Sequence, residues 1–463
     1  MILNIIFFIL CYIIIVGDWM KSKYIWVGTF IVVIFLIGVM ATLKFKNLDS
    51  ETVNSLEGTV LSYNNDTLII QDMNNAIYTF KMEDKDINVG EHIILEYMGI
   101  IDKLKNLQDN QVVSYQVVNE TTSDNNVDGI FSKFYQQASK RMESMTIDQK
   151  IKQLLLIRYP EESISDIGGY VFFEKDFKGK TKDEVKKMIN SLQEKASIPL
   201  LTAVDEEGGK VVRISSNKNL VEEKFKSSKE LYEAGGLEAI NEDVKLKSSV
   251  LHNLGLNVNL APVVDVADDE NAYIYPRTIG KNAEITSNYA SSVIKTSKGT
   301  DVSYVLKHFP GYGNNSDTHI DEARDERTYD DILNNDILPF KAGIEAGAEA
   351  VLVSHNIITS LDEDNPATLS SSVHNLLKVN LGFTGVIITD DLDMGATKDI
   401  EKKYLKAVLA GNDILIVTDY EKAYMEIKTG ILDKDISESL IDQATLKVLA
   451  WKYYKGLMME NEK

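Results

Sequence analysis

Eight short apolar stretches alternate with stretches of helical periodicity in the C-terminal two thirds of the chain, and this alternation constrains the fold most strongly. The apolar stretches span residues 154–157, 169–173, 199–204, 257–264, 302–308, 350–354, 385–389 and 413–417. The helical stretches span residues 181–196, 228–254, 285–299, 332–346, 370–380 and 401–409. Strands that alternate with helices are typical of α/β proteins with parallel sheets. Eight such strands predict a (β/α)8 barrel of the TIM type over residues 130–463.

An open, doubly wound sheet is the alternative architecture. That fold usually carries a G-x-G-x-x-G turn after its first strand, which binds a dinucleotide. No such turn follows the first apolar stretches, and no phosphate-binding Gly-Lys-Ser/Thr loop is present. The barrel is therefore favoured.

The N-terminus predicts a membrane anchor within residues 1–46. Residues 24–43 (YIWVGTFIVVIFLIGVMATL) contain no charge, and a helix of this length spans the roughly 30 Å of a bilayer core. Residues 2–16 form a second, shorter apolar stretch, so translation starts at Met20 or both stretches insert as a hairpin. With Lys21 and Lys23 inside, the rest of the chain lies on the extracytoplasmic side of the cell membrane. We expect an uncleaved anchor because no A-x-A cleavage site follows; a cleaved signal peptide is the alternative.

The composition excludes several classes of function. The chain has 70 acidic and 49 basic residues, which gives a net charge of −21. A nucleic-acid-binding protein needs a basic surface, so this class of function is excluded. The single cysteine, Cys11, allows neither an intramolecular disulfide nor a thiolate zinc cluster. Nothing in the sequence predicts an oligomeric state.

A small β-rich domain is predicted over residues 52–118. Short alternating stretches are separated there by turn residues such as Asn64-Asn65-Asp66, a pattern typical of an antiparallel barrel or sandwich. Residues 119–129 (NETTSDNNVDG) are polar and predict a linker. The domain contains no catalytic cluster, so we interpret it as a spacer, with a glycan- or protein-binding module as the alternative.

Polar residues gather at the C-terminal ends of the predicted barrel strands, where catalytic groups of such barrels lie. They are Asp205 and Arg213 after the third strand, Asp265 and Arg277 after the fourth, Lys307, His308, Asp317 and His319 at or after the fifth, His355 after the sixth and Asp390 after the seventh. Any one of these residues could be structural. Their convergence on consecutive strands predicts an active site.

These residue types suit a hydrolase that works by double displacement. A carboxylate held at a strand end, such as Asp390, can act as a nucleophile. Asp317 lies two residues before His319, and a carboxylate bonded to imidazole makes a general acid/base near neutral pH. The remaining cations and Asp205 suit sugar hydroxyls or an amide.

Two other chemistries fit less well. A metal site could use His308, His319, Asp317 and Asp390, but their spacing matches no standard metal motif, and we expect no metal. A Ser-His-Asp site needs a G-x-S-x-G turn, which the chain lacks.

Four segments resemble glycoside hydrolase family 3, in its β-N-acetylglucosaminidase (β-N-acetylhexosaminidase) branch. Residues 307–319 (KHFPGYGNNSDTH) resemble that branch's K-H-F-P-G-H-G…D-S-H loop. Residues 203–213 (AVDEEGGKVVR) resemble its D-Q-E-G-G-R-V-x-R stretch. Residues 261–266 (APVVDV) with 277–280 (RTIG) resemble A-P-V-x-D-V…R-S-F-G, and residues 389–394 (TDDLDM) resemble S-D-D-L-x-M.

The resemblance implies roles for individual residues. Asp390 would be the nucleophile that forms a covalent glycosyl-enzyme, and His319, oriented by Asp317, would be the acid/base of a retaining reaction. Since the chain ends soon after the eighth predicted strand, we expect this loop histidine rather than a carboxylate from a second domain. The residues implied to bind the terminal sugar are Asp205, Arg213, Arg277, Lys307 and His308.

The chain departs from the family pattern at four positions without losing a group that this mechanism needs. Tyr312 replaces a histidine, Thr318 a serine, Glu206 a glutamine and Lys210 an arginine. The resemblance implies an exo-acting enzyme, without a cofactor, that removes terminal β-linked N-acetylglucosamine, and we expect peptidoglycan fragments as its substrate. The alternatives are a β-glucosidase or N-acetylglucosaminide phosphorylase of the same family, or a non-catalytic glycan-binding protein.

Overall fold

The computed structural model describes residues 53–64, 67–72, 77–82, 87, 91–98, 111–117, 129–160, 164–267, 269–313 and 323–459. Both predicted membrane segments and all but residue 129 of the predicted linker lie outside these ranges. Within them, no helix is both long enough and apolar enough to cross a bilayer.

Eight parallel strands form a nearly closed barrel, as predicted. They are β6 (Leu155–Arg158), β7 (Gly169–Phe172), β8 (Leu201–Val204), β9 (Val258–Asn259), β10 (Ser303–Phe309), β12 (Ala350–Val353), β14 (Val386–Thr389) and β15 (Leu415–Val417). They pair in the order β14-β12-β10-β9-β8-β7-β6-β15. A parallel bridge between Ile388 and Ile414 brings the two edges of the sheet together.

Side chains alternate along each strand between two apolar layers, as the pleat of a strand requires. Val305 belongs to the cluster inside the barrel, whereas the next residue, Leu306, belongs to the cluster between the strands and the outer helices. Leu156 and Ile157 divide between the layers in the same way. Because both faces are covered, the strands are nearly continuously buried.

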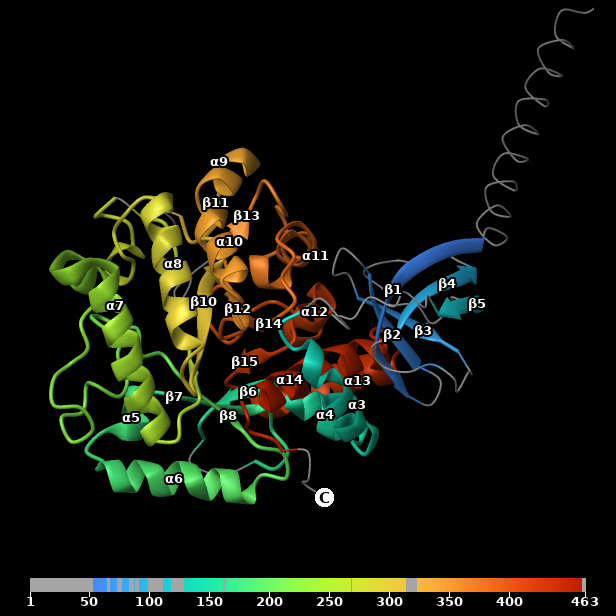
Figure 1. Cartoon of the computed structure of the whole chain (residues 1–463), viewed down its shortest axis with the longest axis horizontal. Helices are drawn as coiled ribbons and strands as arrows, with labels where there is room; N and C mark the ends of the chain where they lie inside the picture. The colour runs from blue at the N-terminus through green and yellow to red at the C-terminus, as the bar shows by residue number, and fades with distance from the viewer. Residues whose placement is uncertain are drawn as a thin grey trace, which may run out of the picture.

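Helices surround the strands (Figure 1). They are α3 (Tyr135–Glu143), α4 (Ile147–Gln153), α5 (Glu174–Phe177), α6 (Lys182–Lys195), α7 (Ser228–Asn253), α8 (Ala283–Ser297), α9 (Tyr329–Asn334), α10 (Ile337–Glu345), α11 (Ser371–Asn375), α12 (Lys403–Ala410), α13 (Tyr420–Leu432) and α14 (Glu438–Tyr454). Short turns of helix cover Ser132–Phe134, Tyr275–Arg277, Ala367–Leu369 and Leu376–Asn380. Thr146 and Thr181 cap α4 and α6 in capping boxes, as their spacing to Gln149 and Glu184 predicts.

Several predicted elements differ from the structure, and one strand and one helix show the physical reason clearly. The stretch 257–264 forms only β9, followed by an isolated bridge from Val263 to Lys307. Pro262 lies between them and has no N–H to donate to a ladder. The predicted helix 332–346 is divided into α9 and α10 at Asn335, whose backbone is not helical.

One end of the barrel is sealed by helices. Phe131, Tyr135 and Trp451 pack into the same apolar cluster as the inward-facing side chains of the strands. The indole N–H of Trp451 donates to the buried carboxylate of Glu349 at 2.9 Å. A ligand therefore has access only from the opposite end, where the strands finish.

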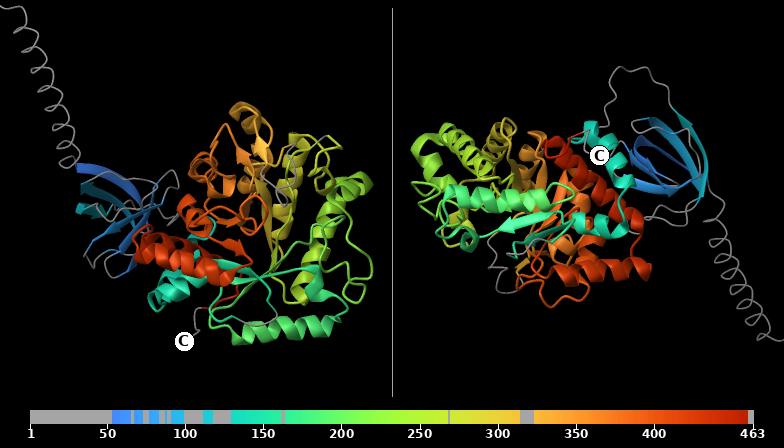
Figure 2. Two further views of the ribbon diagram at one scale, coloured as in Figure 1. Left: turned by 180° about the vertical axis from the view of Figure 1, so that it is seen from behind. Right: turned by 90° about the horizontal axis from the view of Figure 1, so that it is seen from below.

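Five strands form a separate small barrel. They are β1 (Val53–Asn64), β2 (Thr67–Asp72), β3 (Ile77–Lys81), β4 (His92–Met98) and β5 (Gln111–Val117), closed in the order β1-β2-β3-β5-β4. Its interior holds Val60, Leu68, Phe80 and Leu95. It lies beside the larger barrel, with β1 against α3 (Figures 1 and 2).

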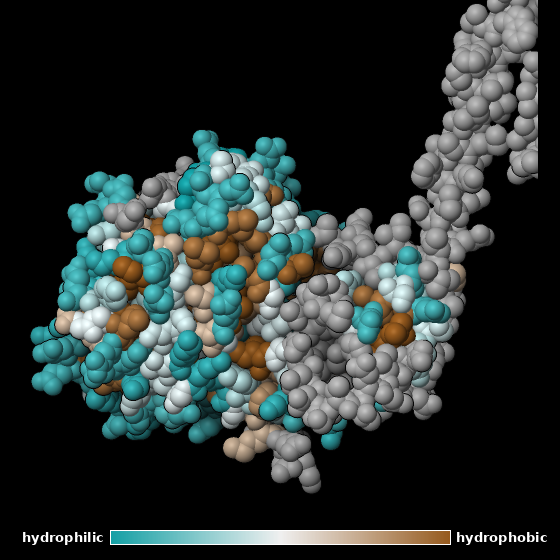
Figure 3. Space-filling model, turned by 45° about the horizontal axis from the view of Figure 1, so that its top comes forward, coloured by the Kyte–Doolittle hydropathy of each residue, from teal (hydrophilic) through white to brown (hydrophobic). Residues whose placement is uncertain are grey.

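Hydrophilic and hydrophobic side chains occupy different parts of the molecular surface. On the face shown in Figure 3, hydrophilic side chains cover most of the periphery of the larger domain, and hydrophobic ones gather nearer its centre.

Two more short strands, β11 (Arg324–Asp325) and β13 (Ile357–Ile358), pair in parallel outside the barrel.

We predict that Leu306→Ala lowers the free energy of unfolding by about 2–5 kcal/mol, because the fully buried side chain would leave a cavity between β10 and the helices. The same substitution at Leu246, which is 57% exposed, should change it by less than about 0.5 kcal/mol. Urea unfolding of the two variants measures both changes. Equal losses of unfolding free energy would contradict the placing of Leu306 in the apolar layer between the strands and the outer helices.

Candidate active site

A pocket of about 240 Å³ opens at the C-terminal ends of the barrel strands. Its lining includes Arg158, Phe173, Asp205, Glu207, Arg213, Tyr273, Arg277, Lys307, His308, Tyr312, Asp390 and Asp391. The apolar side chains Val171, Leu260, Leu352, Met394 and Ile416 also line it. Small-ligand pockets commonly combine such an apolar lining with a few converging polar groups.

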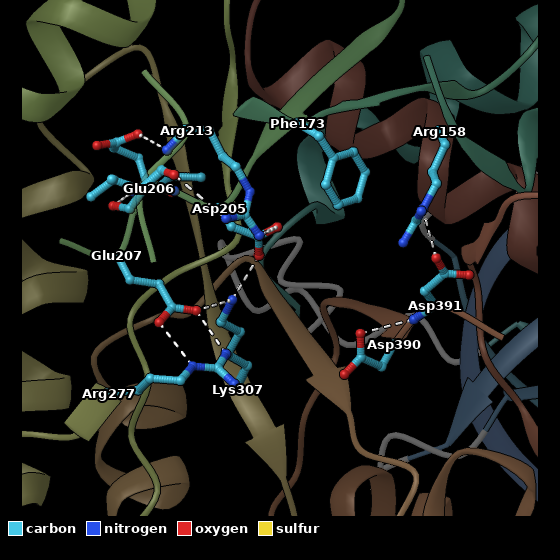
Figure 4. Close-up of polar contacts among 12 residues, drawn as sticks. Arg158, Phe173, Asp205, Glu206, Glu207, Arg213, Arg277, Lys307, Asp390 and Asp391 are labelled. Carbon is cyan, nitrogen blue, oxygen red and sulfur yellow. Dashed lines mark hydrogen bonds and ion pairs between the residues drawn. The ribbon is translucent and has the colours of Figure 1, made fainter. Parts of the chain in front are cut away.

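Lys307 lies at the centre of the polar side of the pocket. Its ammonium group is 2.8 Å from Asp205 Oδ1 and 2.7 Å from Glu207 Oε1, and only 3% of its side chain is exposed. Burial alone would lower the pKa of Lys307, but the charges of Asp205 and Glu207 raise it above its usual value. Lys307 is therefore a fixed cation (Figure 4).

Glu207 joins Lys307 to Arg277. Arg277 donates through Nε and Nη2 to the two oxygens of Glu207, at 3.1 and 2.8 Å. Burial would raise the pKa of Glu207, but Arg277 and Lys307 hold it well below its usual range. This bidentate geometry fixes the guanidinium plane.

His308 is held on both ring nitrogens. Nε2 lies 3.1 Å from Arg277 Nη2, and Nδ1 lies 2.8 Å from Asp265 Oδ2. Since a guanidinium only donates, Nε2 accepts and Nδ1 carries the hydrogen that is donated to Asp265. Asp265 also accepts from the backbone N–H of Tyr312 at 2.7 Å, which fixes the start of the following loop.

Arg213 is positioned by the buried carboxylate of Glu206. That carboxylate accepts from the backbone N–H groups of Arg213 and Ile214, both at 2.7 Å, and from Ser215. The Arg213 guanidinium lies 3.6 Å from Asp205 Oδ2. The glutamate at this departure from the family pattern therefore organises the loop that carries Arg213.

Asp390 follows β14 on the opposite side of the pocket from Arg277 and Lys307 (Figure 4). The backbone N–H of Asp391 donates to Asp390 Oδ1 at 2.8 Å and orients the carboxylate. The side chain of Asp391 accepts from Arg158 Nε at 2.9 Å. Burial raises the pKa of Asp391.

Asp393 anchors the loop that carries Asp390. Its carboxylate accepts from Lys403 Nζ and Tyr404 Oη, both at 2.7 Å, and from the backbone N–H groups of Thr418 and Asp419. Burial raises the pKa of Asp393, but these donors outweigh it and lower the value to about 2. The loop after β14 is thereby tied to α12 and to the end of β15.

The pocket brings together six of the eight residues to which the family resemblance assigns roles: Asp205, Arg213, Arg277, Lys307, His308 and Asp390. Asp317 and His319 lie in 314–322, outside the described residues, and their roles stay predictions. His355 is not among the residues that line the pocket; it is fully buried, with Nε2 2.9 Å from the carbonyl oxygen of Asp391. In the described part of the chain, no group of three or more His, Cys, Asp or Glu side chains could hold a metal ion.

Four residues of the pocket are not singled out by the sequence pattern: Glu207, Arg158, Phe173 and Tyr273. Glu207 stands in the same charged run as Asp205, so the run itself contained the signal. Arg158 is the last residue of β6 and follows the strand-end rule, but it stands alone among apolar neighbours in the sequence. The two aromatic residues have no local signal that separates them from core residues.

The sequence pattern of the "Glycosyl hydrolase family 3 N terminal domain" matches residues 146–451. The chain therefore belongs to glycosyl hydrolase family 3, which makes it a glycoside hydrolase. Within that family it resembles the β-N-acetylglucosaminidase branch.

Individual relatives support this branch. A β-hexosaminidase of Xanthomonas campestris is 31% identical over 235 residues, which make up 50% of this chain and 70% of the relative. The family 3 β-N-acetylglucosaminidase from Paenibacillus sp. str. FPU-7 has a TM-score of 0.64 and 28% identity over 68% of this chain. This chain spans 63% of that structure, somewhat less than two thirds. The β-N-acetylhexosaminidase from Beutenbergia cavernae has a TM-score of 0.60 and 25% identity, over 67% of this chain and 99% of its own.

We predict that Glu207→Gln lowers the free energy of unfolding by about 3 kcal/mol at pH 7, because it leaves buried Arg277 without its counter-charge. The depressed pKa of Glu207 means that this contribution is complete above its unfolded pKa of about 4.3 and is lost as the pH falls towards the folded value. The difference between wild type and variant should therefore narrow from pH 6 to pH 3.

Urea unfolding at a series of pH values measures this difference. Glu238→Gln, at an exposed position of α7, is the control and should leave the unfolding free energy nearly unchanged. A difference that stays constant over the whole pH range would show that the charge of Glu207 makes no contribution.

Proposed function

We propose that the protein is a retaining exo-β-N-acetylglucosaminidase that removes terminal β-linked N-acetylhexosamine from glycans. The observation that carries the proposal is the position of Asp390, which lines the same pocket as the largely buried set of Asp205, Lys307, Arg277 and His308. A carboxylate nucleophile on one side and fixed sugar-binding groups on the other are what a double displacement needs.

In the first step, the carboxylate of Asp390 attacks the anomeric carbon of the terminal sugar. The bond from this carbon to the glycosidic oxygen breaks, and the leaving oxygen takes a proton from His319, which Asp317 orients. The product of this step is a sugar esterified to Asp390 and a shortened glycan. Asp205, Lys307, Arg277 and Arg213 hold the sugar hydroxyls throughout.

In the second step, water attacks the same carbon and gives its proton to His319. The bond between this carbon and Asp390 breaks, which restores the carboxylate and releases the monosaccharide. Two inversions at one carbon leave its configuration unchanged. The Asp391 N–H that orients Asp390 stabilises the carboxylate when it leaves.

The natural substrate and the location are part of the proposal. The uncharged stretch 24–43 supports an anchor in the cell membrane, with the catalytic domain on the extracytoplasmic side. An enzyme held there meets the cell wall, so peptidoglycan fragments are the proposed substrate.

The first test compares an aryl β-N-acetylglucosaminide with the matching β-glucoside, using the full chain in mild detergent. We expect release of the phenol from the N-acetylglucosaminide and loss of this activity in Asp390→Ala, because the variant lacks the nucleophile. Lys175→Gln, an exposed change outside the pocket, is the control. Preferential release from the glucoside would replace the proposal with a β-glucosidase, and release only with added phosphate would replace it with a phosphorylase.

The second test concerns His319. We expect His319→Ala to lower kcat/KM by about 100- to 10,000-fold on an alkyl N-acetylglucosaminide, because the leaving oxygen needs a proton. The loss should be smaller with a dinitrophenyl leaving group, whose oxygen needs none. Equal losses on both substrates would contradict the assignment of His319 as the acid.

A further inference from the structure

One corner of the pocket combines a half-exposed arginine with apolar side chains. Arg158 ends β6, and the strands on either side of β6 are β7 and β15. Val171 of β7 lies opposite Arg158 in the strand register, and Ile416 lies on β15. Phe173 follows β7, and its ring centre is 4.4 Å from the Arg158 guanidinium carbon (Figure 4).

Arg158 has donors left for a ligand. Its Nε donates to Asp391, and the described residues offer no hydrogen-bond partner to its two Nη groups. The side chain is 46% exposed, whereas Lys307 and Arg277 are 3% and 13% exposed. Arg158 is thus the most accessible cation that lines the pocket.

The local charge selects the kind of ligand. Asp390 and Asp391 place two carboxylates near Arg158. Arg213, whose guanidinium carbon lies 5.5 Å from the centre of the same Phe173 ring, adds a second positive charge, but it is paired with Asp205 at 3.6 Å. The corner therefore offers no net positive charge to an anionic ligand. A guanidinium only donates hydrogen bonds, so its partner must supply an acceptor. A neutral carbonyl meets both conditions, and the apolar side chains around it suit an attached methyl group.

The position of Arg158 in the pocket indicates which group of the sugar it contacts. Asp390 must lie next to the anomeric carbon C1, and the acetamido group is carried by the neighbouring carbon C2. The hydroxyl-binding residues Asp205, Lys307 and Arg277 lie across the pocket from Asp390 (Figure 4). Arg158 lies on the Asp390 side, bonded to the next residue in the chain.

We infer that Arg158 is a specificity-determining residue that donates to the carbonyl of the 2-acetamido group, while Val171, Phe173 and Ile416 contact its methyl group. This inference rests on the proposed function and names the part of the site that separates an amino sugar from glucose. A 2-hydroxyl group is shorter than an acetamido group and carries neither a carbonyl for the guanidinium nor a methyl group for the apolar corner.

The test measures kcat/KM of the full chain on an aryl β-N-acetylglucosaminide and the matching β-glucoside, which differ only at C2. We expect Arg158→Gln to lower the ratio of the two values about tenfold, as expected for the loss of one charge-assisted hydrogen bond. Arg158→Lys should restore part of the ratio because it keeps a donor. Lys175→Gln, an exposed change on α5, should leave the ratio and both activities unchanged.

The ratio separates recognition from a structural role. If Arg158 only holds Asp391, and through it Asp390, the variant loses both activities equally, as Asp391→Asn should, and the ratio of the two kcat/KM values stays that of wild type. An unchanged ratio, with or without loss of activity, overturns the inference.

A binding measurement without turnover separates this inference from the proposed function. Ligand-observed NMR should show that wild type prefers N-acetylglucosamine to glucose and that Arg158→Gln loses this preference. If Arg158→Gln loses the binding preference but wild type hydrolyses neither aryl glycoside, the inference is supported and the proposed function is rejected. If wild type hydrolyses the N-acetylglucosaminide but Arg158→Gln keeps the binding preference, the proposed function is supported and the inference is rejected.

Discussion

The burial of the Lys307 charge at the mouth of an otherwise apolar barrel is the constraint on which the site depends. A buried ammonium is tolerated only when carboxylates compensate for its lost hydration, and Asp205 and Glu207 both lie within 2.8 Å of it. Glu207 in turn fixes Arg277, which fixes one side of His308. Glu207 is the member that both cations share, so its removal would leave Arg277 without an ion-pair partner, and the set holds its geometry before a ligand arrives.

Much of this arrangement follows from local sequence patterns. The eight strands of the barrel each correspond to an apolar stretch, because a strand covered on both faces needs apolar side chains at nearly every position. Asp205, Lys307 and Asp390 each stand at the end of such a stretch, and parallel strands bring their C-terminal ends to one side of the barrel. Strand positions and the rule that chemistry lies at strand ends were thus enough to bring six site residues together.

The remaining features depend on contacts between distant parts of the chain. Arg158 and Asp391 are 233 positions apart, and no local pattern shows that they meet. Glu206 stands where the family pattern has a glutamine, and its role in holding Arg213 depends on how the loop folds back over it. The strand β9 is short because Pro262 has no N–H to donate to the parallel ladder. How far this shortens the strand depends on the neighbouring strands, which the local sequence does not show. The roles of Asp317 and His319 are predictions from the sequence alone.

The pocket is closed at its inner end, since Leu260, Leu352 and the inward-facing side chains beneath them fill the barrel down to Trp451. In the proposed reaction, the terminal sugar therefore enters and leaves through the same opening, with the rest of the glycan between it and solvent. The shortened glycan must depart first and the monosaccharide last. Such an enzyme releases its polymer after every bond it cleaves, so it acts distributively along a glycan and cannot be processive.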